Sequence, residues 1–577
     1  MDGFPTYRQN TQRDEVVTTE NRQSDDGSIP TNLPVASDVD VQDTESLPSA
    51  EVFFERRTPY WRQRICLGFS LELNVVLLGI FMFFVIFLIS TDGGTSTTSE
   101  SRQNINDGAL RIPAASPGST QAPTPFLETL NLPDYTVDAI IEYPRSPQSK
   151  AYEWLVSNKT KLATYPKWRM TQRFALATFF FSTRGDFWVN HHGWLDREFH
   201  ECNWEQQSYN LYCMQCDDSG HIKGLTFYGN KLDGTIPPEL SLLSADLELL
   251  SLAVNMELKG QIPTEIGLLT KLRVFQTFNT ELSGTIPTEL GLLSDLRSLE
   301  LGGAGICGTV PTELDNLGCL TNLKFLGMTQ LTGTVPSELF QLTNLTSFGI
   351  SDCPRLASQK VLPKVVESMP QLEFLLLNNN ANDVNARIPT EIARLSNLWM
   401  LSLDEWNLIG LIPSQLGQLT QLVSLTLKEN SLTGHLPPEL SRLRNLTSLY
   451  TSSNQLEGKL PPGLFSSLTA LNRLRMNGNR FIGTIPSEIG LMSNLLELQL
   501  HETVLSGTLP TELLALTNLT TLIVTNTSLS GSIPNELCGI MCGYERECHE
   551  AHGCTSKKTT TNVCQGTLLC GCSCDPC

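Results

Sequence analysis

Two arginines in the last quarter of the chain could hold an anionic group. Arg473 and Arg475 flank Leu474 in a segment with the pattern of a short strand. Because alternate side chains of a strand leave the same face, both guanidinium groups are expected to point the same way. Such a pair can bind a carboxylate through charge-assisted hydrogen bonds. The alternative is a solvated basic pair beside Glu497.

The cysteines indicate disulfides, whereas no other reactive residues form a catalytic pattern. Fifteen of the sixteen cysteines follow residue 200, and nine of those lie between Cys538 and Cys577. This distribution is typical of a secretory, oxidising environment. The ending CGCSCDPC could bind a metal, but we favour a disulfide-stapled cap. Because fifteen is odd, at least one cysteine is free or pairs with a second chain.

Composition and motifs narrow the function. HExxH, GxSxG and P-loop patterns are all missing from the sequence, so we expect no enzymatic activity, no cofactor and no metal site. The net charge of −20 argues against a nucleic-acid partner.

Tandem repeats are the elements that must position these residues. The segment LVSLTLKENSLTGHLPPEL at 422–440 defines the unit LxxLxLxxNxLxGxxPxxL. Its spacing lies within the range of leucine-rich repeats. The turn proline recurs in steps of 24 to 27 residues at Pro237, Pro263, Pro287, Pro311, Pro336, Pro363, Pro389, Pro413, Pro437, Pro461, Pro486, Pro510 and Pro534.

Each unit predicts one short strand and one turn. The second and third leucines of LxxLxL are two residues apart, so a strand buries both on one side. Stacked strands form a parallel sheet on a concave face, and the asparagine turns inward to satisfy backbone groups. Trp406 replaces this asparagine and is too large, so either its ring swings out or the turn distorts. The segment 353–370 loses the Gly-x-Ile-Pro pattern and is expected to form a kink or an exposed loop.

Outward positions of successive strands place a row of side chains on the concave face. Exposed aromatic side chains there could anchor a peptide or a glycan. The predicted ligand-binding residues are Tyr228, Phe278, Phe325, Phe374, Met400, Tyr450, Arg473, Arg475 and His501.

The repeats resemble the plant-specific class of leucine-rich repeat, whose mark is LxGxIPxxL. That mark appears as LDGTIPPEL at 232–240, LSGTIPTEL at 282–290 and FIGTIPSEI at 481–489. The resemblance covers about 170–537. The entry segment ALATFFFSTRGDFW at 175–188 is similar to the N-terminal cap of receptor-like proteins of this class. The cysteine-rich ending and the short acidic inner tail resemble short-tailed diatom proteins without a kinase domain more than land-plant receptors.

This resemblance implies recognition or adhesion at the cell surface. It also implies a disulfide between Cys202 and Cys216. The pair Arg473 and Arg475 is similar to the Arg-x-Arg arrangement by which some plant peptide-hormone receptors hold the C-terminus of a ligand.

An apolar run predicts a membrane span. Leu73 to Ser90 carries no charge. At 1.5 Å per residue it would extend about 27 Å, close to the hydrocarbon thickness of a bilayer. Four arginines between residues 56 and 64 precede it, which places the N-terminus in the cytoplasm. The glycosylation triplets agree, because all of them follow the span, at Asn158, Asn344, Asn445, Asn518 and Asn526.

The predicted fold class is an α/β leucine-rich-repeat solenoid with one N-terminal transmembrane helix. We expect a disordered acidic cytoplasmic tail at 1–64, the transmembrane helix at 71–90, a flexible stalk at 91–130, a helical and cysteine-containing cap at 131–220, a solenoid of about thirteen repeats at 221–537 and a cysteine-rich cap at 538–577.

The predicted function is that of a receptor-like protein in the plasma membrane with extracellular repeats. It would bind a peptide, protein or glycan ligand on its concave face and signal, if at all, through a co-receptor or kinase partner. The alternative is a structural or adhesive cell-surface glycoprotein without a signalling role.

Overall fold

The computed structural model describes residues 125–157, 162–191, 193–204, 214–357, 360–380 and 386–532, and a two-residue strand at 568–569. The predicted tail, the transmembrane helix at 71–90, most of the stalk, the sequon at Asn158 and nearly all of the C-terminal cap lie outside these residues. Within the described part of the chain, no helix combines the length and the apolar character needed to cross a membrane.

The N-terminal cap contains the helices α3 (Pro125–Leu130), α4 (Asp134–Glu142), α5 (Pro147–Val156) and α7 (Lys167–Ser182). Helix α5 begins after Ser146, whose side chain accepts a hydrogen bond from the backbone N–H of Ser149. Helix α3 lies in the last six residues of the predicted stalk, so the stalk ends earlier than expected. Burial explains the difference, because Leu127 and Leu130 pack into an apolar cluster with α5 and α7.

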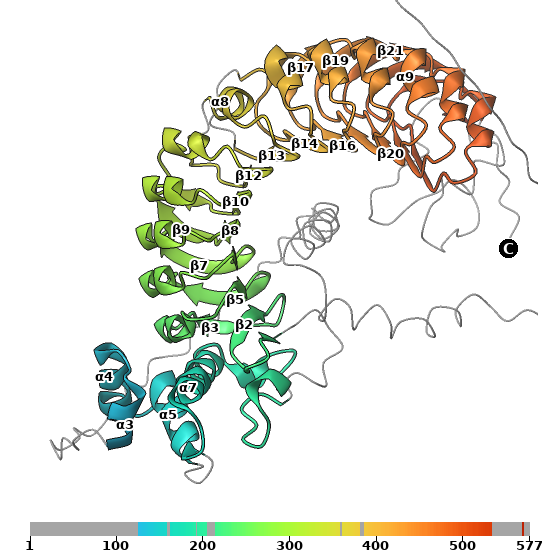
Figure 1. Ribbon diagram of the computed structural model, residues 1–577. Coiled ribbons are helices and arrows are strands. Elements are labelled where there is room, and N and C mark those ends of the chain that lie inside the picture. The colour runs from blue at the N-terminus through green and yellow to red at the C-terminus, as the bar shows by residue number, and fades with distance from the viewer. Residues whose placement is uncertain are drawn as a thin grey trace, which may run out of the picture. The chain divides into compact units, whose positions relative to one another are not determined.

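Buried carboxylates and a disulfide tie the cap together. Glu239, which is fully buried in the first repeat, accepts hydrogen bonds from Thr136 Oγ1 at 2.8 Å and Gln148 Nε2 at 3.1 Å. Cys202 and Cys216, the pair that the resemblance implies, are joined by a disulfide with a Cα–Cα distance of 6.0 Å. These contacts fix the helices over the open end of the first repeat (Figure 1).

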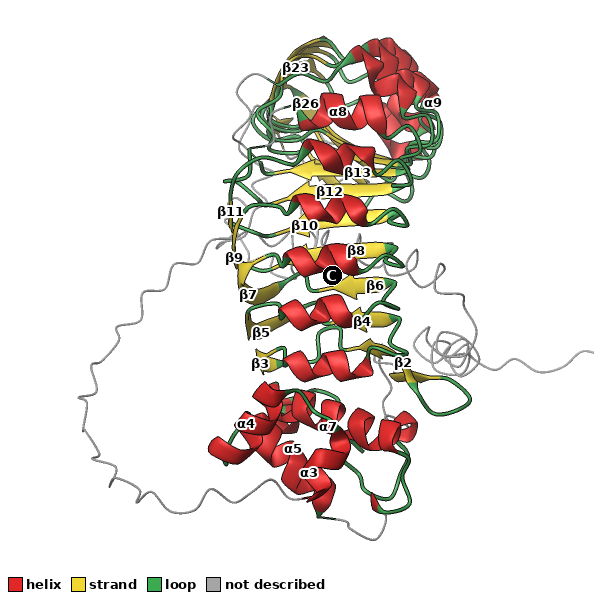
Figure 2. Ribbon diagram, turned by 60° about the vertical axis from the view of Figure 1, so that its left-hand side comes forward, coloured by secondary structure: helices red, strands yellow, loops and turns green. Residues whose placement is uncertain are grey.

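One sheet lines the inner side of the curved stack of repeats (Figures 1 and 2). It has fourteen strands, of which the first is antiparallel and the others, where the structure describes them, run parallel. They are β1 (Met214–Cys216), β2 (Ile222–Thr226), β4 (Leu249–Ser251), β6 (Val274–Gln276), β8 (Ser298–Gly302), β10 (Asn322–Leu326), β12 (Ser347–Ser351), β13 (Phe374–Asn378), β14 (Met400–Ser402), β16 (Ser424–Thr426), β18 (Ser448–Tyr450), β20 (Arg473–Arg475), β22 (Glu497–Gln499) and β24 (Thr521–Ile523).

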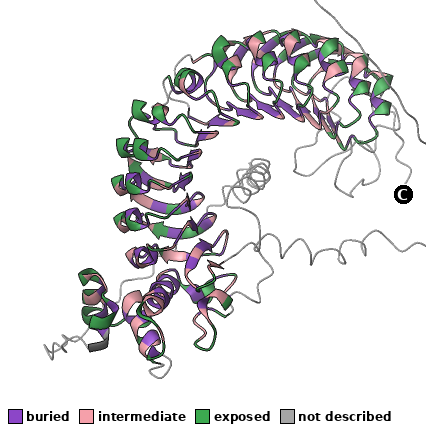
Figure 3. Ribbon diagram, viewed as in Figure 1, coloured by how far each residue is buried: buried purple, intermediate pink, exposed green. Residues whose placement is uncertain are grey.

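The register puts equivalent leucines side by side. Leu425 pairs with Leu449, and Leu449 pairs with Leu474, so one continuous core runs through the stack. Figure 3 shows the buried residues following these inner strands. Because each strand spans only a few residues, neighbouring repeats supply most of the apolar surface that covers each leucine.

An asparagine ladder satisfies the backbone between repeats, as predicted. Asn479 Nδ2 donates to the carbonyl oxygens of Thr451 (2.8 Å) and Met476 (3.0 Å), and its Oδ1 accepts from the N–H of Leu456 (3.0 Å). The other members with corresponding bonds are Asn255, Asn380, Asn430 and Asn454. Where threonine replaces asparagine, the shorter side chain makes fewer bonds at Thr503, whose hydroxyl donates to the carbonyl of Leu500, whereas the Thr280 hydroxyl bonds the carbonyls of Thr277 and Gly302.

Two smaller sheets run along one flank. The first contains β3 (Asp233–Thr235), β5 (Asn255–Gly260), β7 (Thr280–Thr285), β9 (Gly305–Gly308) and β11 (Gln330–Leu331). The second contains β15 (Ile409–Leu411), β17 (Ser431–Gly434), β19 (Gln455–Lys459), β21 (Arg480–Gly483), β23 (Val504–Gly507) and β25 (Ser528–Leu529). A short pair, β26 (Gly531–Ser532) with β27 (Leu568–Leu569), follows. After its turn proline, a typical repeat forms a short helical turn on the convex side, such as α9 (Pro462–Ser467).

Helix α8 (Val361–Ser368) separates the two flank sheets. It occupies the segment 353–370, where a kink or loop was expected. The helix is amphipathic: Val361, Leu362, Val365 and Val366 are buried in the main core.

Trp406 resolves the choice left open by the sequence. Its ring is 1% exposed and belongs to the main core, so the turn distorts and the ring does not swing out. The positive φ of 55° at Glu405 is the ordinary one for this repeat position, as at Glu429, whereas the positive φ of 51° at Asn407, after the tryptophan, marks the distortion. Asn430 Oδ1 accepts the N–H of Trp406 at 3.1 Å and thereby secures the distorted turn.

Candidate ligand-binding surface

The concave sheet brings two predicted arginines together with a carboxylate. Strand β20 pairs Arg473 with Glu497 and Arg475 with Gln499 in β22, and pairs Arg475 with Tyr450 in β18. We call Tyr450, Arg473, Arg475, Glu497 and Gln499 the arginine cluster. Its members come from three adjacent strands, so the parallel register alone creates the cluster.

Within the arginine cluster, Glu497 accepts two hydrogen bonds from Arg475. Arg475 Nε donates to Glu497 Oε1 at 2.8 Å, and Arg475 Nη2 donates to Oε2 at 3.1 Å. Arg473 Nε is more distant, at 3.8 Å from Oε2. Burial works against the charge of Arg475, but its bonds to Glu497 raise the pKa of the guanidinium above its ordinary value. Two guanidinium groups therefore share one carboxylate, and the three charges sum to one positive charge.

Tyr450 provides the aromatic ring of this cluster, and His501 follows Gln499 by two residues. The guanidinium carbon of Arg475 lies 4.8 Å from the centre of the Tyr450 ring, a cation–π geometry. Tyr450 is only 5% exposed, and burial raises the pKa of its hydroxyl. Burial lowers the pKa of the half-buried His501. The lowered pKa favours the neutral imidazole of His501, so we expect it to offer an anion a polar contact.

Aromatic residues of the first half form an apolar cluster on the concave side. It consists of Ala253, Phe278, Leu326 and Leu376, with the half-buried Tyr228, Val254 and Phe374 around them. Phe278 is 1% exposed, so the expectation of an exposed anchor is wrong at this position. Gly302 lets the cluster close, because a Cβ there would lie 2.7 Å from the Cα of Phe278. Tyr228 and Phe374 are the two predicted residues that keep accessible surface here.

Two other predicted residues lie elsewhere or deeper than expected. Phe325 is paired in register with Leu301, is fully buried and belongs to the main core. The prediction that it faces the concave side is wrong, because it occupies the third leucine position of its repeat and Leu326 faces outward instead. Met400 does lie on the concave strand β14, but it is only 6% exposed.

A polar network between these clusters was missed by the sequence analysis. Asp404 is 6% exposed; its Oδ2 accepts from Thr426 Oγ1 at 3.1 Å, and its Oδ1 accepts from the Lys428 N–H at 2.9 Å. Burial raises the pKa of Asp404 to about 7, although Lys428 and these hydrogen bonds oppose the rise. The clue in the sequence was an aspartate on the outward position of a repeat, with Thr426 and Lys428 at neighbouring outward positions one repeat later.

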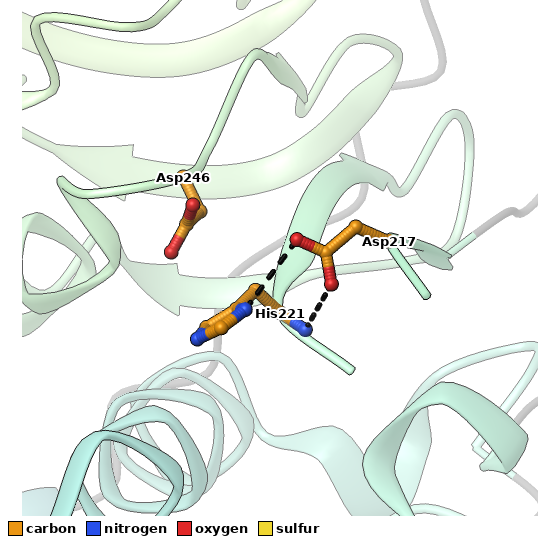
Figure 4. Close-up of side chains that lie close together, drawn as sticks. All are labelled: Asp217, His221 and Asp246. Carbon is orange, nitrogen blue, oxygen red and sulfur yellow. Dashed lines mark hydrogen bonds and ion pairs between the residues drawn. The ribbon is translucent and has the colours of Figure 1, made fainter. Parts of the chain in front are cut away.

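Three possible metal ligands meet at the first repeats. Figure 4 shows Asp217, His221 and Asp246, whose ligand atoms lie within 4.8 Å of one another. Lys223 already provides a cation there, with its Nζ 3.1 Å from Asp246 Oδ1 and 3.9 Å from Asp217 Oδ2. The backbone N–H of His221 holds the pKa of Asp217 below its ordinary value. We therefore assign the group a structural role in the turn between β1 and β2.

The predicted glycosylation residues in the described part of the chain are exposed. Asn344, Asn445 and Asn518 occupy the same position in their repeats, just before a concave strand. Each side chain donates to a carbonyl one repeat earlier, at 2.9, 3.1 and 2.9 Å respectively. Asn526 lies after its strand and is also exposed.

Three cysteines of the described repeats carry no disulfide. Cys307 and Cys319 are exposed, and Cys353 is buried. Burial raises the pKa of the Cys353 thiol to about 12, so this residue is an unreactive part of the core.

Comparison with known proteins identifies the repeat. The family model described as Leucine Rich Repeat matches residues 421–443 and 518–540. The solenoid is built from leucine-rich repeats. The resemblance predicted from the sequence is thus confirmed at the level of the repeat. A search of curated proteins finds no significant match.

Several solved leucine-rich-repeat structures are similar to this chain. The receptor-kinase ectodomain GASSHO1/SCHENGEN3 from Arabidopsis thaliana, in complex with CASPARIAN STRIP INTEGRITY FACTOR 2, is 28% identical over 55% of this chain and 40% of that one, with a TM-score of 0.44. The plant peptide hormone receptor RGFR1, in complex with RGF2, is 26% identical over 58% and 63%, with a TM-score of 0.43.

A bacterial leucine-rich-repeat protein is similar to the same degree. The protein from Leptospira interrogans is 27% identical over 54% of this chain and 74% of that one, with a TM-score of 0.42. This chain spans 40% and 63% of the lengths of the two plant receptors above. Because these TM-scores are low, the assignment of the solenoid as leucine-rich repeats rests on the repeat pattern of this chain itself.

Proposed function

We propose that this chain is a non-catalytic receptor-like protein of the cell surface, whose concave sheet binds an extended peptide or protein segment that ends in a carboxylate. The arginine cluster carries this proposal. Arg473 and Arg475 together exceed the charge of Glu497, and Arg473 lies the farther from that carboxylate, at 3.8 Å. A second carboxylate would therefore meet a net positive charge at this pair of arginines.

The polar network and the apolar cluster extend this surface along the sheet. Asp404 and Thr426 are buried in this network, and the half-buried Lys428 beside them offers an ammonium donor to a ligand backbone carbonyl. Tyr228 and Phe374, at the edge of the apolar cluster, would contact apolar side chains farther along the ligand. A signal would pass to a separate co-receptor or kinase partner.

The binding proposal can be tested with a display library of random peptides. One half of the library keeps a free C-terminal carboxylate and the other half is amidated, and each is offered to the full-length protein. We expect enrichment of peptides with free carboxylates. In the combined variant Arg473→Ala and Arg475→Ala, affinity for an enriched peptide should fall about 10-fold to 100-fold, the range for losing a charge-assisted hydrogen bond.

Two controls separate binding from folding. Arg442→Ala removes an exposed arginine from a convex turn and should leave affinity unchanged. Glu497→Gln keeps the shape of the cluster while it removes the competing carboxylate, so it should tighten binding. Equal enrichment of amidated peptides, or equal affinity of the arginine variant, would refute the proposal. Broad, salt-sensitive binding to polysaccharide in its place would favour the adhesive alternative.

The proposed topology places residues 71–90 in the membrane and the repeats outside the cell, glycosylated at the predicted asparagines. Protease treatment of intact cells that express the full chain tests this arrangement. We expect fragments of the repeats to be released and residues 1–64 to be protected. Protection of the repeats would contradict the proposed sidedness.

A further inference from the structure

A shallow pocket lies on the flank of the solenoid where the chain enters the concave strands. Its volume is about 690 Å³. The lining side chains come from four successive repeats, those of β13, β14, β16 and β18. They include Glu373, Asn397, Trp399, Gln418, Gln421 and Asn445. The pocket shares no lining side chain with the arginine cluster or the apolar cluster, although its Trp399 contacts Phe374 at the edge of the apolar cluster.

Trp399 gives the pocket a rigid aromatic surface. Its backbone N–H donates to the carbonyl oxygen of Glu373 at 2.9 Å, and its own carbonyl accepts from the N–H of Val423 at 2.8 Å. The indole packs against the Phe374 ring, with 5.7 Å between ring centres. The side chain nevertheless stays half-exposed. A fixed, accessible indole is a surface on which a flat apolar face can stack.

The other lining groups are polar and planar. Glu373, Asn397, Gln418 and Gln421 are exposed around the pocket and present carboxylate and amide groups. One aromatic plane with several such groups suits a pyranose ring, whose C–H face stacks on an indole while its hydroxyls bond to amides and carboxylates. An apolar ligand would leave these polar groups without partners.

Asn445 brings a possible source of sugar to the same pocket. It is the acceptor of a glycosylation triplet, it is exposed, and it lines the pocket. Its Nδ2 donates to the carbonyl oxygen of Thr420 at 3.1 Å. Glycosylation replaces one of the two amide hydrogens, so the remaining hydrogen can keep this bond. A glycan at Asn445 would therefore begin inside the pocket, two strands from Trp399.

We infer that this pocket is a saccharide-binding subsite in which a sugar ring stacks on Trp399. The inference rests on the proposed glycosylation where the sugar is the core of the Asn445 glycan. The same chemistry would accept a free oligosaccharide. If the concave surface fails its peptide-binding test, the saccharide inference is unaffected, because the pocket and the proposed peptide site share no side chain.

The chain contains two matched comparison sites. Asn344 and Asn518 occupy the same repeat position as Asn445 and make the same type of hydrogen bond, to the carbonyl oxygens of Gly318 and Ser493. The residues that correspond to Trp399, two repeats earlier, are Arg297 and Asn472. A glycan at either site would meet no aromatic ring at that position.

The first test measures how fast an amidase removes each glycan from the native, full-length protein, with site occupancy followed by mass spectrometry of the glycopeptides. We expect release at Asn445 to be several-fold slower than at Asn344 or Asn518. Trp399→Ala should bring the rate at Asn445 up to the rates at the other two sites. Trp399→Phe keeps an aromatic ring and should keep most of the protection, which separates stacking from a general loss of structure.

The second test distinguishes a free sugar from the attached glycan. In Asn445→Gln, which lacks the acceptor, N,N′-diacetylchitobiose is added and its contact with the protein is measured by saturation-transfer NMR. Slow release at Asn445 that depends on Trp399 supports the attached glycan. Chitobiose contact that disappears in Asn445→Gln with Trp399→Ala supports a free saccharide. Equal release rates at all three sites together with no chitobiose contact would overturn the inference.

Discussion

Replacing Asp404 by asparagine is expected to stabilise the centre of the solenoid at neutral pH. Asp404 is 6% exposed and has a pKa of about 7 because burial penalises its charged form. Asparagine has nearly the same shape, and its Oδ1 can still accept the N–H of Lys428. The variant therefore removes a buried charge and keeps the hydrogen bond that joins the two repeats.

The direction in which pH changes the stability depends on whether the folded or the unfolded chain binds the proton of Asp404 more tightly. The folded chain holds the proton of Asp404 up to about pH 7, whereas the unfolded chain releases it near its ordinary pKa of 3.8. Stability is therefore highest below pH 3.8 and falls as the pH rises towards 7, above which the loss is complete. The full interval corresponds to about 4 kcal/mol, of which about 3 kcal/mol falls between pH 5 and pH 8. The Asp404→Asn variant should lack this dependence.

Hydrogen–deuterium exchange of the full-length protein can measure this effect locally. Peptides that cover β14 and β16 are compared at pH 5 and pH 8 after correction for the intrinsic exchange rate. Protection of the wild type should fall with pH, and protection of Asp404→Asn should not. Asp295→Asn is the control, because it removes a carboxylate whose side chain is 46% exposed. The same pH dependence in the wild type and in Asp404→Asn would refute the reasoning.

Two further variants test the contacts between repeats and at the cap. Asn479→Ala removes the bonds of this side chain to three carbonyls and to the N–H of Leu456, and it should cost about 3 kcal/mol in unfolding free energy. Asn494→Ala, on the exposed flank, should cost little. Similar denaturation midpoints of the two variants would count against the asparagine ladder. The double variant Cys202→Ser with Cys216→Ser should lower the unfolding free energy of the cap by about 2 to 4 kcal/mol, measured by denaturant unfolding. A midpoint equal to that of the wild type would show that the helices of the cap remain in place without the disulfide.

The repeat spacing was sufficient to predict the parallel sheet and the inward asparagines, because these features depend on sequence period alone. Side-chain environments were harder to predict where a repeat departs from its consensus. Phe325 replaces a leucine and therefore looked like an outward aromatic residue, although its register partner Leu301 shows that it belongs to the core. Trp406 could swing out or distort the turn, and that choice depends on the space that neighbouring repeats leave.

The arginine cluster shows a second limit of sequence reasoning. The alternation of Arg473 and Arg475 was enough to place both side chains on the concave face. It could not show how closely Glu497 approaches each of them, since the two distances of 2.8 and 3.8 Å depend on rotamers across two strands. Asp404 was missed for a related reason, because the burial that raises its pKa depends on how the repeats pack and not on the residues next to it in sequence.

Helix α8 has a mechanical consequence. Along the inner sheet, neighbouring repeats share a ladder of backbone bonds, whereas among the residues that the structure describes the flank sheets stop at β11 and resume at β15. Among the described residues, the flank bonds at this gap include those of Ala357 to Gly333 and of Ile409 to Ala386. With few flank bonds, a pulling force along the stack would fall mainly on the inner ladder between β12, β13 and β14. The repeats around α8 should therefore yield first under tension, and the two halves of the rod would separate there before either half unravels.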